Sequence, residues 1–403
     1  MNTTRALGSV AARGSSTLLS GAYVLLLVGY AGEEIAGRIL SVLGVGLLLG
    51  VLAQLGAGVE VMGSVAGRDA PAVVSRALGH SLFVGLALGL CGSIVLVFIG
   101  GRAELALVLM VVPSVAVSSL CGKALVGAGH TAVGGLVENG LGSGLAAIGL
   151  IFDRGEAGIA VSLAVGWAVA STCAAVVAGR KGGLVLGPIV VASMCRPRIR
   201  ESLRRNWVLL GMQMSLALAQ HGQTLVVITL VGPFEAGVYA AVQRVTRSTS
   251  LLATGLNSLS AGTMARLSRA QDCIGLLQHL KRGDRQYLWA GVLGFLVLAP
   301  AGLWVLDFTL GGLGLASVIA TGVLLLGGCI NIASGPGHLV LQLWGEHKVS
   351  AGLAVGSTIL GLTVGGLLAL NFGIRGAALA EAGSIVLSNV GAAIVSRRLL
   401  ATY

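Results

Sequence analysis

Stretches of about 20 predominantly apolar residues recur along the whole chain, separated by short polar segments. Each stretch is long enough to cross a hydrocarbon core of roughly 30 Å as an α-helix. They cover residues 9–29, 39–62, 78–100, 104–126, 132–152, 158–178, 207–231, 237–262, 287–309, 314–336, 350–370 and 376–396. A β-barrel is excluded, because its strands alternate apolar and polar positions over about ten residues and these stretches are continuously apolar. The pattern predicts an all-α polytopic membrane protein with about twelve transmembrane helices.

Composition agrees with this prediction and removes most soluble functions. Of 403 residues, 55% are hydrophobic and only 10% are charged, whereas about a quarter of residues are charged in soluble domains. No phosphate-binding Walker loop, no histidine and carboxylate set at metal spacing and no Ser-His-Asp or Cys-His set is recognisable. The six cysteines are scattered, without metal or disulfide spacing. We therefore expect no enzyme activity, metal or cofactor.

The basic residues predict the orientation. With the N-terminus in the cytoplasm, about 20 of the 26 Lys and Arg lie in or beside cytoplasmic loops, and only about four, Arg38, Arg102, Arg154 and Arg375, lie on the far side. Both termini are then cytoplasmic, in a multi-pass protein of the cell (inner or plasma) membrane. Membrane topology and contact with anionic lipid headgroups explain the net charge of +11 without a nucleic acid.

The densest basic segment divides the chain into two blocks of six spans. We predict an N-terminal half at 1–182, a basic cytoplasmic linker at 183–206 and a C-terminal half at 207–403. A weak internal repeat supports the division: Ala36-Gly37 matches Ala236-Gly237, and His130 matches His347. Blocks with an even number of spans have the same orientation, so we expect two halves around a central cavity in which substrate binds.

Glycines and prolines predict packing and kinks. The chain contains 64 glycines, and small residues allow helices to approach closely in lipid. Pro113, Pro300 and Pro336 are the candidates for kinks.

Two arginines in the eighth span are the strongest functional signal. A charge at mid-membrane costs about 2.5–3.5 kcal/mol on insertion scales. Arg244 and Arg247 are three residues apart and therefore share one side of a helix, and a polar stripe extends along it. The stripe consists of Gln243, Arg247, Ser250, Thr254 and Asn257. It predicts a wet, cationic cavity, with snorkelling of both arginines to an interface as the alternative.

Other polar residues in the spans extend this hypothesis. Gln213, Gln220 and His221 lie in the seventh span, and Arg13 in the first. We predict that they line the cavity with the arginine pair. Glu138 and Glu381 are carboxylates inside predicted spans, and each is a candidate for ion coupling or for a structural hydrogen bond.

Two segments resemble a known family. The sequence "FEAGVYAAVQRVTRSTSLLATGLNSLSAGTMARLSR" (234–269) is similar to the seventh-to-eighth-span segment of Wzx-type polysaccharide biosynthesis flippases in the MOP (MATE-like) superfamily. The sequence "GEHKVSAGLAVGSTILGLTVGGLLALNFGIRGAALAEA" (345–382) resembles their eleventh and twelfth spans. The resemblance covers the layout of nearly the whole chain and is local in sequence.

The resemblance implies flipping of an undecaprenyl-diphosphate-linked oligosaccharide to the outer leaflet, for O-antigen, lipopolysaccharide or exopolysaccharide synthesis. It also implies membrane lipids, a glycan polymerase and export machinery as partners. Arg13 resembles the first-span cation of peptidoglycan-precursor flippases, but Gln54 and Glu60 stand where those place basic charge, which favours surface-glycan export. The alternatives are a cation-coupled multidrug exporter of the same superfamily and a membrane glycan polymerase or ligase.

Overall fold

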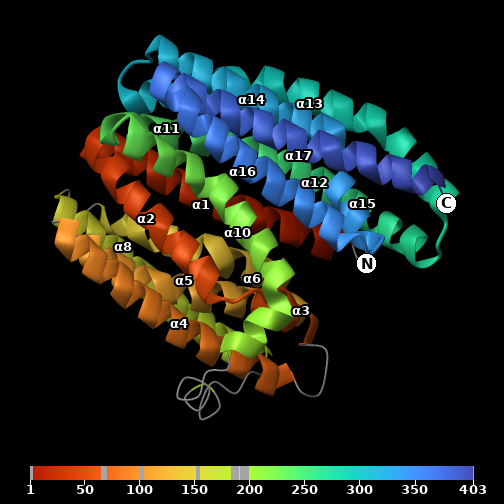
Figure 1. Ribbon diagram of the computed structural model, residues 1–403, viewed down its shortest axis with the longest axis horizontal. Coiled ribbons are helices and arrows are strands. Elements are labelled where there is room, and N and C mark those ends of the chain that lie inside the picture. The colour runs from red at the N-terminus through yellow and green to blue at the C-terminus, as the bar shows by residue number, and fades with distance from the viewer. Residues whose placement is uncertain are drawn as a thin grey trace. The chain divides into compact units, whose positions relative to one another are not determined.

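The computed structural model describes residues 3–64, 70–99, 104–150, 155–182, 190 and 199–402. This part of the chain is helical and contains no strand. The elements, labelled in Figure 1 where there is room, are α1 (Thr3–Ala31), α2 (Glu33–Ala53), α3 (Ala57–Ser64), α4 (Ala70–Ile99), α5 (Glu104–Gly127), α6 (Thr131–Asn139), α7 (Leu141–Gly149), α8 (Glu156–Gly182), α10 (Ile199–Leu230), α11 (Pro233–Thr246), α12 (Ser248–Arg269), α13 (Cys273–Leu310), α14 (Leu315–Ser334), α15 (Gly337–Leu343), α16 (His347–Phe372) and α17 (Ile374–Thr402).

Nine helices of the described chain are long and apolar enough to cross a membrane: α1, α2, α4, α5, α8, α13, α14, α16 and α17. The prediction of an all-α polytopic membrane protein is confirmed. The described residues of the other three predicted spans are also helical, but these helices are shorter or more polar than the nine. The spans at 132–152 and 237–262 are each divided, into α6 and α7 and into α11 and α12, and α10 is more polar than the nine.

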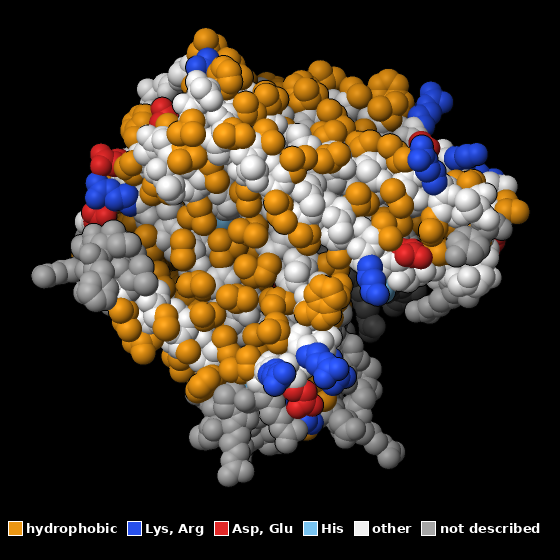
Figure 2. Space-filling model, in the orientation of Figure 1, with side chains coloured by type: hydrophobic (Ala, Val, Ile, Leu, Met, Phe, Trp, Pro, Cys, Tyr) orange, Lys and Arg blue, Asp and Glu red, His pale blue; other side chains and the backbone are white. Residues whose placement is uncertain are grey.

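The surface of the described residues is that of a lipid-facing protein. Figure 2 shows hydrophobic side chains over most of the visible face, with Lys and Arg gathered in a few separate clusters. Large apolar side chains that water would disfavour are widely exposed, including Trp304 and Phe308 on α13. These exposed faces are physically reasonable when the surrounding solvent is hydrocarbon.

The chain divides into two compact units. The first comprises residues 7–225 and is built around α5, whose membrane segment is 78% buried. Helices α2, α3, α4, α6 and α8 all pack on α5. Glycines allow the closest of these approaches: a Cβ on Gly122 of α5 would lie 2.8 Å from the carbonyl oxygen of Gly134 of α6. The predicted role of glycine in close packing is realised at this crossing.

The second unit comprises residues 1–6 and 226–403. Here α17 packs on α14, α15 and α16, and α14 also packs on α11, α12 and α13. The 38-residue α13 is only 17% buried in its apolar part. At 1.5 Å per residue it is about 57 Å long, so its polar first half extends beyond a hydrocarbon core of roughly 30 Å. The boundary between the units falls within α10, and the end of the predicted linker at 183–206 forms the first turns of that helix.

Three helix interruptions position the polar groups described below. Between α2 and α3, Leu55 and Gly56 have φ values of 50° and 74°. Between α11 and α12, Arg247 interrupts the helix within a run of hydroxyl residues, Thr246, Ser248, Thr249 and Ser250, each of which donates to the carbonyl three residues before it. Such bonds compete with the helical ladder and bend helices.

The third interruption is at Gly335 and Pro336, between α14 and α15. Gly335 has a φ of 79°, which favours glycine. Of the three predicted kink prolines, Pro336 lies at a break, whereas Pro113 and Pro300 lie inside the continuous helices α5 and α13.

The internal repeat has a counterpart in local geometry. Gly32 precedes α2 with a φ of 83°, and Gly232 precedes α11 with a φ of 132°. In each case the amide of the alanine four residues later, Ala36 or Ala236, donates to the glycine carbonyl at 3.1 Å. The two matched sequences therefore start their helices in the same way.

Candidate functional site

A buried polar network in the unit that contains residues 226–403 joins α11 to α17. Tyr239, Gln243 and Arg247 are spaced by four residues and lie along one side of α11 and its C-terminal cap. The Tyr239 hydroxyl donates to Glu381 Oε2 at 2.5 Å, and Gln243 Nε2 lies 2.9 Å from both Glu381 oxygens. The Gln243 Oε1 accepts from Arg247 Nη2 at 2.9 Å. The Gln243 side chain thus bridges the guanidinium of Arg247 to the carboxylate of Glu381.

Arg244 differs from Arg247 in its partners. Its side chain is partly buried, and among the described residues it has no hydrogen bond and no ion pair. Two guanidinium groups therefore share this region with one carboxylate, Glu381. The excess positive charge is the feature that can bind an anionic group.

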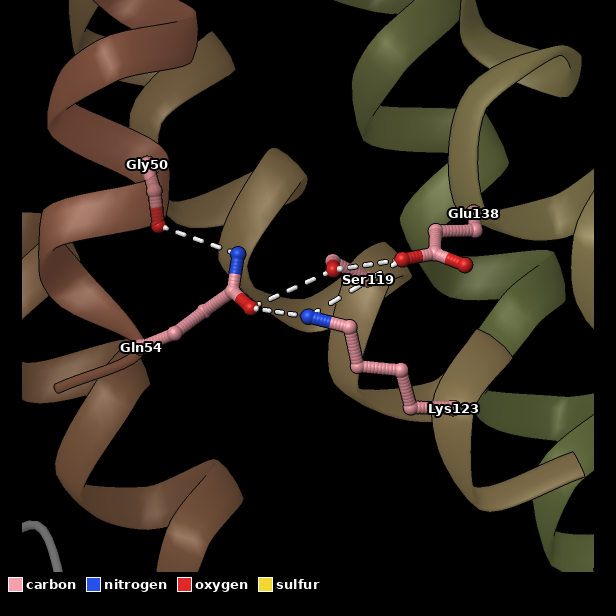
Figure 3. A network of polar contacts seen from close by, with 5 residues as sticks. All are labelled: Gly50, Gln54, Ser119, Lys123 and Glu138. Atoms are coloured by element: carbon pink, nitrogen blue, oxygen red, sulfur yellow. Dashed lines mark hydrogen bonds and ion pairs between the residues drawn. The ribbon is translucent and has the colours of Figure 1, made fainter. Parts of the chain in front are cut away.

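A second polar network lies in the unit of residues 7–225, at the interruption between α2 and α3 (Figure 3). The Lys123 ammonium donates to Gln54 Oε1 at 3.0 Å and lies 3.9 Å from Glu138 Oε1. The Ser119 hydroxyl lies between the same two acceptors, at 3.2 Å from Gln54 Oε1 and 3.4 Å from Glu138 Oε1. Lysine and glutamate neutralise each other here, so the second network has no excess charge.

The remaining predicted residues do not all belong to these networks. Gln213, Gln220 and His221 are on α10, in the unit of residues 7–225, whereas Arg244 and Arg247 are in the other unit. His221 packs beside Gly44 of α2, and the Oε1 of Gln213 is buried without a hydrogen-bond partner in the described chain. Arg13 is part of α1, but its side chain lies outside the described residues.

Asn257 is the predicted site residue with a different set of neighbours. Its Oδ1 accepts a hydrogen bond from the Tyr287 hydroxyl of α13 at 3.3 Å. Asn257 therefore lies between α12 and α13, whereas Gln243 lies on α11 and faces α17. The predicted polar stripe on one helix thus contributes to two distinct environments.

Sequence reasoning did not include Tyr239 among the site residues. The available signal was its spacing, because Tyr239 lies four residues before Gln243, as Gln243 lies four before Arg247. A single tyrosine in an apolar helix is usually a packing residue, and its polar partner in the structure is the carboxylate of Glu381, 142 residues away in the sequence.

Comparison with known proteins places this arrangement of helices in a class. No family model matches the chain, and no curated protein matches it. Its fold, however, is similar to that of solved MATE transporters, and nine helices of the described chain are long and apolar enough to cross a membrane. The predicted all-α polytopic fold is therefore confirmed, and membership of the MOP superfamily and the Wzx-type subtype stay predictions.

Three solved structures illustrate the similarity. An inward-facing multidrug resistance MATE family transporter matches with a TM-score of 0.68 and 17% identity, over 98% of this chain and 97% of that chain. A variant of the Vibrio cholerae MATE transporter VcmN matches with a TM-score of 0.60 and 15% identity, over 100% and 96%. A MATE protein in a straight conformation matches with a TM-score of 0.58 and 18% identity, over 98% and 94%. At these identities the likeness shows the fold and not the substrate.

Proposed function

We propose that this protein flips a polyprenyl-diphosphate-linked oligosaccharide across the membrane and that Arg244 and Arg247 bind the diphosphate. The fold supports membrane transport. The substrate is proposed from the charge of the site and from the resemblance of residues 234–269 and 345–382 to polysaccharide flippases.

Arg244, which has no hydrogen bond or ion pair to another described residue, is the observation that carries the proposal. Keeping a guanidinium in a membrane helix without a counter-ion is costly, and a bound anion removes this cost. A diphosphate suits the site, because the planar guanidinium fork donates two parallel hydrogen bonds to phosphate oxygens. Arg247, three residues away, supplies a second cation on the same side of the helix.

Glu381 gives the site a means of coupling to protons. In the structure, Gln243 holds Arg247 beside Glu381. When Arg247 turns to a diphosphate, the carboxylate of Glu381 loses its nearby cation, and uptake of a proton then offsets the buried charge. In this proposal Glu381 takes up a proton as substrate binds and releases it as substrate leaves.

A multidrug exporter of cationic compounds is the competing function, and it fits the fold equally well. Such a cavity needs free acidic groups. In the described chain, the buried Glu381 is already bonded to Tyr239 and Gln243, and Glu138 is paired with Lys123. The charge of the two networks therefore favours an anionic cargo.

Reconstituted liposomes distinguish the two functions. The full-length protein would be tested for flipping of a fluorescent polyprenyl-diphosphate oligosaccharide and, in parallel, for accumulation of ethidium. We expect flipping by the wild type, and a loss of about 10- to 100-fold in Arg244→Ala and in Arg247→Ala, because each removes charge-assisted hydrogen bonds worth about 1.5–3 kcal/mol.

Arg375→Ala is the matched control, because Arg375 is an exposed arginine in the same unit. It should flip the lipid at the wild-type rate. Undiminished flipping in both Arg244→Ala and Arg247→Ala would refute the diphosphate site, and ethidium transport without flipping would establish the exporter instead.

A further inference from the structure

Two neighbouring cavities lie at the interruption between α14 and α15, away from the arginine pair. The larger, of about 240 Å³, is lined by residues of α12 and α13, including Ser260, His279 and Gln286. The smaller, of about 120 Å³, is lined by residues of α12, α13, α14, α15 and α17. Tyr287 and Pro336 line both cavities. We call the two chambers together the Tyr287 pocket.

Three carboxamides from three helices converge on the smaller chamber. Asn257 is on α12, Asn331 on α14 and Asn389 on α17. Asn389 Nδ2 donates to the Ile385 carbonyl at 2.8 Å, which leaves its Oδ1 for a ligand. In the described chain the Asn331 side chain has no hydrogen bond of its own. The Asn331 carboxamide is partly buried, so its donor and acceptor groups are open to a bound polar molecule.

The rest of the smaller chamber is uncharged. His338 reaches the Ser350 hydroxyl at 2.9 Å through Nδ1 and the Ser388 hydroxyl at 3.0 Å through Nε2. One of the two hydroxyls can donate to the unprotonated ring nitrogen and the other can accept from the protonated one, so both nitrogens are satisfied in a neutral imidazole. The chamber therefore offers carboxamide donors and acceptors and no net charge.

Tyr287 fixes the wall between the chambers. The residue is 6% exposed, and its hydroxyl lies 3.3 Å from both Asn257 Oδ1 and Ser260 Oγ, one polar group from each side of the pocket. These contacts hold a flat aromatic surface in place. An aromatic face beside carboxamides presents an apolar surface and hydrogen-bonding groups to the same ligand.

Hydroxyl-rich rings match this chemistry best. A sugar hydroxyl is both donor and acceptor, like a carboxamide, and the ring has apolar C–H faces. An isolated phosphate would find few cations in the smaller chamber, whereas Arg282, on the wall of the larger chamber, is exposed. Both chambers, of about 240 and 120 Å³, lie below the roughly 300–1,000 Å³ of ordinary small-molecule sites, which limits the ligand to a single small ring.

We propose that the Tyr287 pocket is a carbohydrate subsite that binds one sugar unit through the carboxamides of Asn331 and Asn389. This inference deepens the proposed function and rests on it, because the glycan part of the cargo is the sugar that would occupy the pocket. The subsite gives the transporter a means of distinguishing glycans that the arginine pair, which reads only the phosphates, does not provide.

Calorimetry on the purified full-length protein tests the proposal. The probes are N-acetylglucosamine, galactose and rhamnose, with inorganic phosphate as the alternative class of ligand. We expect at least one sugar to bind at concentrations up to tens of millimolar. Asn331→Leu and Asn389→Leu should each weaken that binding about 3- to 10-fold, as expected for the loss of a neutral hydrogen bond, and the double variant should abolish it.

Asn371→Leu is the matched control. Asn371 also lies in a helix of this unit and donates to the carbonyl four residues before it, Leu367, at 2.9 Å, but it is exposed and outside the pocket. Its substitution should leave sugar binding unchanged, and the unfolding midpoint of every variant would show that the protein is folded.

The outcomes separate this inference from the diphosphate model. Arg244→Ala should lose flipping and keep sugar binding, whereas Asn331→Leu should lose sugar affinity. Absence of binding for every sugar, unchanged binding in Asn331→Leu and Asn389→Leu, or binding of phosphate that these variants weaken would each overturn the carbohydrate subsite. A sugar-binding protein whose arginine variants still flip would instead refute the diphosphate site alone.

Discussion

The two polar networks of this protein both hold charged side chains among apolar helices, but they differ in how far those charges are compensated. In the unit of residues 7–225, Lys123 and Glu138 are one cation and one anion that lie directly beside each other, and Lys123 also donates to Gln54. In the unit of residues 226–403, Gln243 links one anion, Glu381, to Arg247, and Arg244 remains without a partner in the described chain. The first network is electrically neutral, and the second has an excess positive charge.

The difference shows which buried charges can act on a ligand. A compensated pair offers little to a substrate, because binding must first break it. An uncompensated cation is already destabilised, so a bound anion improves the stability of the protein. This is why we place the diphosphate at Arg244 and Arg247 and assign Lys123 and Glu138 a structural role.

The largest predicted effect breaks the bridge in the charged network. Gln243→Met keeps the side-chain length but removes hydrogen bonds to Glu381 and Arg247, both of which carry charge. We expect a loss of about 3 kcal/mol or more in the free energy of unfolding. Gln54→Met, its counterpart in the neutral network, should cost only about 1–2 kcal/mol, since Lys123 and Glu138 still neutralise each other. Chemical denaturation of the purified proteins measures both, and equal losses would contradict the comparison.

An intermediate effect is predicted for the ion pair itself. Lys123→Met leaves Glu138 without its cation and should cost about 2 kcal/mol, discounted because the two side chains are 20% and 25% exposed. Adding Glu138→Gln should recover most of this loss. The double variant should also transport at the wild-type rate. If it is stable but inactive, Glu138 serves in ion coupling, and the structural role assigned to this pair is wrong.

The smallest predicted effect concerns the packing that brings Glu138 to Lys123. A Cβ on Gly122 would lie 2.9 Å from Glu138 Cβ, so Gly122→Ala must push α5 and α6 apart. We expect a cost of about 1–2 kcal/mol from overpacking. Gly352→Ala on α16 is the control, because nothing lies within 4 Å of its added methyl group. Thermal unfolding measures both variants. Equal unfolding midpoints for Gly122→Ala and Gly352→Ala would contradict this prediction.

The candidate site was only partly predictable. The arginine pair and the stripe through Gln243 followed from helical spacing alone, but the spacing did not show that Asn257 contacts Tyr287 and lies in a different environment from Gln243. The role of Gln243 was not predictable, because it depends on a carboxylate 138 residues away in the sequence. The link between Gln54 and Lys123 spans 69 residues and depends on the helix interruption after Ala53. No local pattern reports which sides of two distant helices face each other.

The sequence by itself determined that the chain is helical, that it lies in a membrane and that one helix carries two arginines. Hydropathy and helical period are properties of neighbouring residues, and lipid leaves a continuously apolar segment almost no alternative to a helix. Tertiary structure alone decided which charges are compensated and where carboxamides converge on a pocket. Those outcomes depend on the rotation and register of packed helices, which small differences in side-chain fit determine.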